Sequence, residues 1–159
     1  MNKDMSVVCD NGILNIRSGA IIMNDGKLLM VGNNRDYLYS VGGRLKFGET
    51  AEEAVIREVF EETGVKMEIN RLGFVHENYF YSDAQSSLNK LVYEISFFFY
   101  MNVPDSFTPI SDSFIEGNSR ERLVWVSIED DRKMYPEFFK TELKNPTNTV
   151  KYFISDNRK

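Results

Sequence analysis

Thiol and imidazole groups are almost absent from this sequence of 159 residues, which contains one cysteine, Cys9, and one histidine, His76. A lone cysteine cannot form a disulfide within the chain. One cysteine with one histidine also cannot assemble a Cys/His zinc site. Both kinds of site are therefore excluded, and we interpret Cys9 as a small buried or terminal thiol.

Long apolar runs are also missing. The first residues, 1–6, show no apolar stretch of roughly 7 to 15 residues followed by a cleavage site, and nowhere do about 18 apolar residues follow one another. This pattern indicates neither a signal peptide nor a membrane span. We therefore expect a cytoplasmic protein without a membrane partner.

Positive charge is in deficit, because 19 Lys and Arg residues stand against 24 Asp and Glu residues, a net charge of −5. A surface of this sign repels a nucleic-acid backbone, so no nucleic-acid partner is expected. A polyanionic substrate would need a bridging cation.

The 42% hydrophobic and 27% charged residues are typical of a globular protein. The length suits one domain, predicted over residues 1–159.

Segments rich in β-branched and aromatic residues predict most of the secondary structure. The expected strands cover residues 13–23, 27–31, 37–41, 68–81, 88–102 and 123–128. Residues 24–26 have the composition of a hairpin turn, and residues 82–87 form a polar connection in a second, longer hairpin. In that hairpin the side chain of Glu94 points to the opposite face of the sheet from those of Tyr93 and Ile95. Burial of the Glu94 carboxylate on that face would be costly without a partner.

The second half of the chain gives weaker signals. Residues 104–122 combine prolines, serines and mixed charge, which favours a surface loop. Residues 136–143 predict a short helix, and the tail after Asn145 has no strong signal.

A helix of about 14 residues is predicted after Thr50. Thr50 and Glu53 have the spacing of a capping box, and Gly64 stands where a helix ends. At about 100° per residue, one side of this helix is apolar. On the other side Glu58, Glu61 and Glu62 crowd within an arc of roughly 100°, with Arg57 at its edge.

Such an anionic face is usually only a solvated surface. Two features argue against that interpretation here. Glu58 and Glu62 are four residues apart, where like charges repel by a few tenths of a kcal/mol without a cation between them. The glycine pair Gly42–Gly43, six residues before Glu49, lets a loop carbonyl reach the same place, and hard divalent cations select such oxygen ligands.

The segment GRLKFGETAEEAVIREVFEETGV, residues 43–65, resembles the Nudix box at every defined position. The matching positions are Gly43, Glu49, Arg57, Glu58, Val59, Glu61, Glu62, Gly64 and Val65. Seven fixed residues at ordinary frequencies would match by chance on the order of 10⁻⁸ times per window. One departure is Ser40–Val41 before the paired glycines, where many members carry proline; this loosens the loop without affecting a ligand.

Resemblance to the Nudix (MutT-like) hydrolases implies an α+β fold, an α/β/α sandwich with a mixed β-sheet. It implies a metal-dependent pyrophosphohydrolase, which cleaves a nucleoside diphosphate linked to another moiety by attack of water on phosphorus. The cofactor would be Mg²⁺, with Mn²⁺ as the alternative. By the same resemblance the metal ligands would be the side chains of Glu58, Glu61 and Glu62 with the backbone carbonyl of Gly42. Arg57 would orient the glutamates, and Glu49 would pair with Arg57 rather than bind the metal.

The resemblance leaves the general base open. Glu61 is our first choice, and Glu121 and Glu116, just before the strand that contains Trp125, are the alternatives. Each of these two would otherwise be a surface glutamate in a polar loop.

Substrate choice also stays open among NTP or dNTP, ADP-ribose and nucleotide sugars. The aromatic residues 79–81 could stack a base, although strand aromatics are more often core. Arg35 and Arg44 could meet phosphate.

The main alternative function is a catalytically silent Nudix domain that senses a nucleotide or binds a protein. An isomerase or RNA-processing enzyme on this fold would need further motifs or a basic surface. The expected partner is a small-molecule nucleotide, and a homodimer is an open alternative to a monomer.

Overall fold

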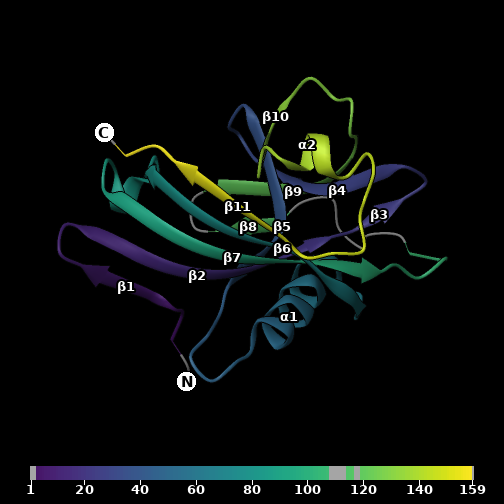
Figure 1. Ribbon diagram of the computed structural model, residues 1–159, viewed down its shortest axis with the longest axis horizontal. Coiled ribbons are helices and arrows are strands. Elements are labelled where there is room, and N and C mark those ends of the chain that lie inside the picture. Colours follow the sequence, from purple (N-terminus) through teal and green to yellow (C-terminus); the bar gives the residue numbers. More distant parts are fainter. Residues whose placement is uncertain (1–2, 108–113, 117–118, 159) are drawn as a thin grey trace.

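The computed structural model describes residues 3–107, 114–116 and 119–158, with only the backbone given for 114–116 and 119–120. A long mixed β-sheet dominates it (Figure 1). The strands are β1 (Ser6–Cys9), β2 (Gly12–Ile21), β3 (Met23–Asn24), β4 (Lys27–Gly32), β5 (Tyr37–Arg44), β6 (Glu68–Tyr81), β7 (Leu91–Asn102), β8 (Phe114–Glu116), β9 (Ser119–Ser127), β10 (Lys133–Tyr135) and β11 (Lys151–Asp156). The helices are α1 (Ala51–Thr63), α2 (Phe139–Glu142) and a 3₁₀ turn at Gln85–Ser87.

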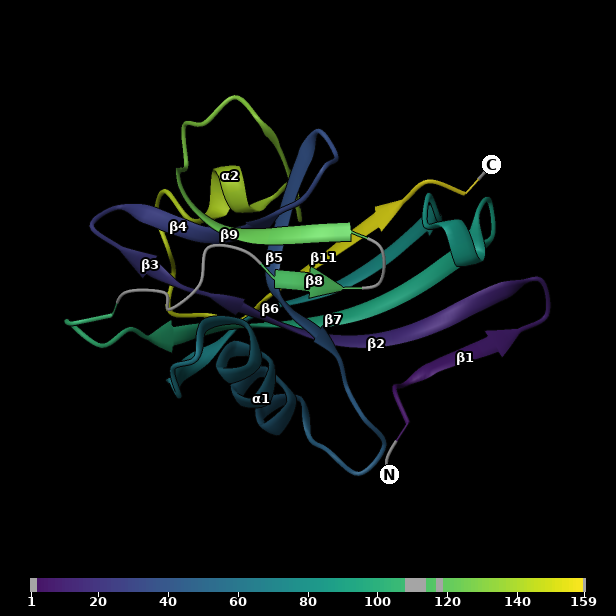
Figure 2. The ribbon, with the colours of Figure 1, turned by 180° about the vertical axis from the view of Figure 1, so that it is seen from behind.

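The sheet runs in the order β11-β6-β7-β2-β5-β4-β9-β8, with β1, β3 and β10 pairing beside this path. The pairs β2–β7, β6–β11 and β5–β10 are parallel, which makes the sheet mixed. β2 and β5 pair only over Arg17–Ala20 and Val41–Arg44. Beyond this junction the strands diverge into a first arm (β1, β2, β7, β6, β11) and a second arm (β5, β4, β9), as Figures 1 and 2 show.

Helices cover both faces of the sheet. One buried cluster contains Val55 and Val59 of α1 together with Ile22, and the other contains Phe139 of α2 together with Ile21. Ile21 and Ile22 are adjacent on β2 yet belong to different clusters, because successive strand residues point to opposite faces. The predicted α+β sandwich with a mixed sheet is therefore confirmed.

The expectations for the second half of the chain need three corrections. Residues 104–122 are not all loop: β9 begins at Ser119, because residues 119–121 pair with β8 and the strand then pairs with β4 from Arg122 onward. Residues 108–113 and 117–118 lie outside the described part. The helix predicted at 136–143 is only four residues long and begins at Phe139. The tail forms β11, which pairs with β6.

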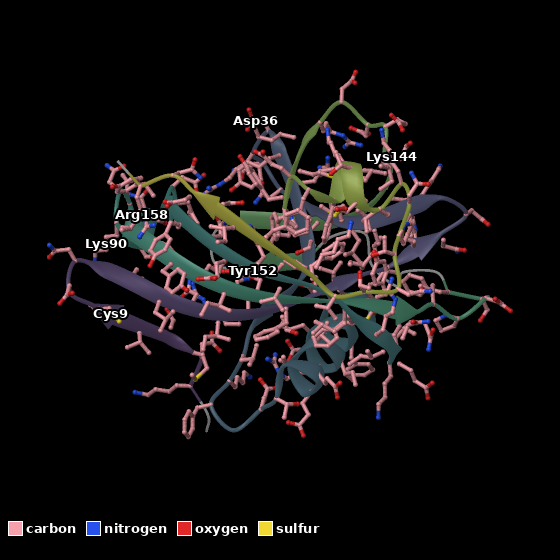
Figure 3. The ribbon with its side chains drawn as sticks, viewed as in Figure 1. Cys9, Asp36, Lys90, Lys144, Tyr152 and Arg158 are labelled. Atoms are coloured by element: carbon pink, nitrogen blue, oxygen red, sulfur yellow. The ribbon has the colours of Figure 1, made fainter. Side chains whose placement is uncertain are left out.

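Other features agree with the sequence. Cys9 is exposed near the N-terminus, on β1 at the outer margin of the first arm (Figure 3). In the described part of the chain, no helix combines the length and apolar composition needed to cross a membrane. The single-domain assignment stays a prediction.

His76 on β6 should make folding sensitive to acid. Its ring is buried, its Nε2 lies 2.8 Å from Ser155 Oγ, and Phe138 packs edge-on against it. Burial lowers the pKa of His76 from 6.5 to about 4. The neutral ring therefore stabilises the fold fully above pH 6.5, and this contribution is lost as pH falls towards 4.

We expect His76→Gln to reduce the fall in unfolding free energy between pH 7 and pH 4 by about 3 kcal/mol. The measurement is urea unfolding of both proteins at each pH. Because the carboxylates titrate equally in both, the difference isolates His76. Identical pH profiles for the two proteins would contradict the prediction.

Candidate active site

The box helix α1 has defined ends, which fix the direction in which its glutamates project. Thr50 Oγ1 accepts a hydrogen bond from the Glu53 backbone N–H, and the Glu53 carboxylate accepts one from Thr50 N–H, so the predicted capping box is present. Gly64 ends the helix with φ at 78°, a left-handed conformation that favours glycine. The helix is 13 residues long.

The paired glycines at the end of β5 touch the helix carboxylates. A Cβ on Gly42, where φ is 150°, would lie 2.2 Å from the Ser18 carbonyl oxygen. A Cβ on Gly43 would lie 2.3 Å from Glu58 Oε1. Glycine is therefore required at position 42, where the clash would be with backbone atoms, whereas a side chain at position 43 would displace the Glu58 carboxylate. Gly42 N–H also donates to Glu62 Oε2, at 3.3 Å.

Arg57 joins the acidic groups of the box. Its Nε and Nη2 donate to the two carboxylate oxygens of Glu49, at 2.7 and 2.9 Å. Its Nη1 donates to Glu58 at 2.8 Å and to Glu61 at 3.4 Å, and Nη2 also reaches the Arg44 carbonyl oxygen at 3.1 Å. This ion pairing raises the pKa of Arg57 and lowers that of Glu49. The expected Glu49–Arg57 pair is present.

Glu58 and Glu62 lie in an environment that disfavours two negative charges. Burial raises the pKa of Glu58 against the opposing effect of Arg57. Burial, then the charge of Glu58 and, to a smaller extent, that of Glu121, raise the pKa of Glu62 to about 9. Without a cation, Glu62 therefore holds a proton at neutral pH.

Of the two glutamates proposed from the β9 region, Glu121 lies close to the box. It is buried, accepts a hydrogen bond from Tyr39 Oη, and is near enough to Glu62 to raise its pKa. It therefore belongs to the interior of the site rather than to a polar surface loop. The side chain of Glu116 lies outside the described residues.

The donor set suits a hard divalent cation, although the carboxylates do not converge on one point. Among the residues with described side chains, no three His, Cys, Asp or Glu groups are placed to hold a metal ion. Glu61 is about half exposed and turns towards Arg57. Mg²⁺ needs only one or two carboxylates beside water and phosphate oxygens. Glu58 and Glu62, beside the glycine backbone, provide these two carboxylates, and a cation between them would allow both to be ionised.

Arg17 on β2 is a site residue that the sequence did not reveal. Its charge lowers the pKa of both Glu58 and Glu62. Strand alternation could have indicated which face of β2 it occupies, but the pairing of β2 with β5 could not be inferred from local pattern.

The residues suggested for substrate contact are scattered. Tyr79 stacks on Tyr93, with ring centroids 4.3 Å apart, and Arg158 lies over its outer face. Arg35 is paired with Asp83, and Arg44 is exposed at the end of β5. None of them contacts the box carboxylates through a side chain within the described structure.

Comparison with known proteins agrees with this geometry. The family model of the NUDIX domain matches residues 14–141. A MutT-like protein from Streptomyces ambofaciens is 37% identical over 62 residues, which cover 38% of this chain and 40% of that protein. The chain thus matches well under two thirds of that relative's length.

Solved structures show the same fold. A MutT protein from Bacillus halodurans superposes with a TM-score of 0.61 at 14% identity, covering 91% of this chain and 93% of that one. An ADP-ribose pyrophosphatase from Streptococcus suis superposes with a TM-score of 0.55 at 16% identity, covering 89% and 98%. Nudix hydrolases generally use divalent metal ions. Since the NUDIX domain model matches most of the sequence, residues 14–141, and the loop, helix and turn of the box are present, the chain belongs to the NUDIX domain family.

Proposed function

We propose that this chain is a metal-dependent pyrophosphohydrolase, which cleaves a nucleoside diphosphate linked to another moiety by attack of water on phosphorus. The observation that supports the proposal is the contact of Glu58 and Glu62 with the glycine backbone of β5, where the two carboxylates would repel each other if both were ionised. A cation bridging these carboxylates to a pyrophosphate would remove that repulsion.

The proposed metal ligands are Glu58, Glu61, Glu62 and the backbone carbonyl of Gly42. When bound there, Mg²⁺ or Mn²⁺ supplies Lewis-acid stabilisation of phosphoryl oxygens and makes water more acidic. Glu61 is half exposed and would have to rotate away from Arg57 to join the other two. Arg57 holds Glu49 and Glu58 in place, which supports its proposed role in orientation.

For the general base we propose Glu61 first and Glu121 second. Glu61 belongs to the box, and its partly exposed carboxylate can meet water. Glu121 is supported by its buried position near Glu62 and by the hydrogen bond from Tyr39. Phosphoryl transfer requires mainly positioning and charge stabilisation, so loss of the true base should lower kcat more than it raises KM.

The decisive experiment is product chromatography with NTPs, dNTPs, ADP-ribose, nucleotide sugars and dinucleoside polyphosphates, in Mg²⁺, Mn²⁺ or EDTA. We expect cleavage of one class at a phosphate–phosphate bond, with turnover falling by at least about 10³-fold in EDTA. Tight nucleotide binding without cleavage of any class would instead support a catalytically silent domain.

A further inference from the structure

A polar strip extends from the active site along the first arm. Arg17 and Asn15 lie two residues apart on β2, so their side chains share one face of the sheet. Both contact Glu94 on β7: Asn15 Nδ2 donates to Glu94 Oε2 at 3.4 Å, and Arg17 Nε lies 4.0 Å from Glu94 Oε1. In the parallel register of the two strands, Asn15 stands directly opposite Glu94.

One end of this strip adjoins the proposed metal site. The two β2 residues after Arg17, Ser18 and Gly19, pair with Gly43 and Gly42. Asn15 lies about 10 Å farther along β2 than Ser18, at roughly 3.3 Å per residue. This is the scale on which the nucleoside of a nucleotide lies away from its phosphates.

The side-chain oxygen of Asn15 is a buried hydrogen-bond acceptor without a partner among the described residues. Only 5% of the residue is exposed, and its Oδ1 is buried with no hydrogen-bond partner among the described residues. An ionised carboxylate only accepts hydrogen bonds, so Glu94 must face the amide nitrogen of Asn15. The amide is thereby held with Oδ1 directed away from Glu94. A buried acceptor left unmatched destabilises the fold, and a donor supplied by a ligand would satisfy it.

We propose that Asn15 is a specificity-determining residue, whose Oδ1 accepts a hydrogen bond from an N–H or O–H group on the nucleoside part of the substrate. This inference rests on the proposed function, because it places the phosphates at Glu58 and Glu62. Arg17 lies between the two ends and is placed to neutralise phosphate charge. Glu94 acts through Asn15 as a positioning residue. The donor is either a sugar hydroxyl or an exocyclic base amine.

The test compares matched nucleotides in wild type and Asn15→Leu. Comparing ATP with 2′-deoxy-ATP and 3′-deoxy-ATP tests for a hydrogen bond from a sugar hydroxyl. Comparing ATP with ITP tests for one from the base amine. The corresponding ADP-ribose analogues serve if that class is the one cleaved. Both kcat/KM in Mg²⁺ and Kd by calorimetry are measured for each compound.

Wild type is expected to favour the donor-bearing member of one pair by about tenfold or more, mainly through KM. Asn15→Leu should reduce that preference to within about twofold and leave the other pairs unchanged. Glu94→Gln should reduce the same preference. The amide of glutamine can both donate and accept hydrogen bonds, so it would no longer fix the orientation of the Asn15 amide. Asn102→Leu is the matched control, because Asn102 is exposed and bonded to Asn70 away from the strip.

The outcomes separate this inference from the proposed function. A purely structural Asn15 predicts that Asn15→Leu melts at a higher temperature and keeps every wild-type preference, which would overturn the inference. Absence of a preference in wild type would overturn it as well. Preferences in Kd that depend on Asn15, without turnover of any nucleotide, would instead overturn the proposed function alone.

Discussion

Glu62→Gln is expected to lower kcat by about 10³-fold while leaving the metal-free fold almost unchanged. Because the pKa of Glu62 is raised to about 9, its carboxyl is protonated at neutral pH in the absence of metal. Glutamine resembles that neutral form in size and can still accept the Gly42 N–H bond. The substitution removes only the charge that the proposed cation would need.

Steady-state kinetics in Mg²⁺ and thermal melts with and without Mg²⁺ test this prediction. Wild type should be stabilised by Mg²⁺, and Glu62→Gln should not. Glu52→Gln is the matched control, since Glu52 is exposed on the same helix and outside the carboxylate cluster. Retained turnover in both Glu62→Gln and Glu61→Gln would refute the proposed site.

Arg57→Met should impair stability and catalysis together. Arg57 is partly buried and donates hydrogen bonds to two oxygens of Glu49, one of Glu58 and the Arg44 carbonyl. Its loss would leave partly buried carboxylates without a partner, at a cost of about 2–3 kcal/mol in unfolding free energy. We expect kcat/KM to fall by about 10²-fold, because Glu58 would no longer be held in one orientation.

Urea unfolding and kinetics of the same preparations separate the two effects. The unfolding free energy and kcat/KM of Arg57→Lys should lie between those of wild type and Arg57→Met. An ammonium group keeps the charge but cannot form the bidentate contact with Glu49. Arg132→Met is the control, because Arg132 is exposed and, among the described residues, forms an ion pair with the nearby Asp130 alone. That change should alter unfolding free energy by less than about 1 kcal/mol. If Arg57→Met and Arg132→Met changed unfolding free energy and kcat/KM equally, the proposed role of Arg57 in holding the carboxylates would be wrong.

Sequence patterns predicted the structure correctly where it depends on contacts between residues close together in the chain. The capping box at Thr50 and the glycine that ends α1 depend on contacts between residues three or four apart, which sequence spacing displays directly. The Glu49–Arg57 pair, which the resemblance to the Nudix box implied, is also present. The strands β2, β4, β5, β6, β7 and β9 were all foreseen from composition, although β9 begins earlier than expected.

Residues whose environment depends on distant strands could not be predicted in the same way. The polar start of β9, residues 119–121, has the composition of a loop and forms a strand by pairing with β8, and the C-terminal tail, which has no strong local signal, forms β11 only by pairing with β6. The same holds for Glu94, whose need for a partner was evident but whose partners on β2 were not. These errors arise because pairing between strands far apart in sequence overrides local propensity.

The amino-acid sequence by itself determined the box helix and the set of acidic residues on one helical face, because these follow from periodicity and short-range spacing, and its resemblance to the Nudix box implied the family fold. Only the tertiary structure decided which oxygen atoms meet at the glycine backbone, that Glu121 and Tyr39 lie beside them, and that Asn15 is buried next to Glu94. The parallel pairing of β2 with β7 and the short junction of β2 with β5 bring these groups together. Long-range strand register has no signature in the local sequence, so the shape and charge of the site emerge only when the chain is folded.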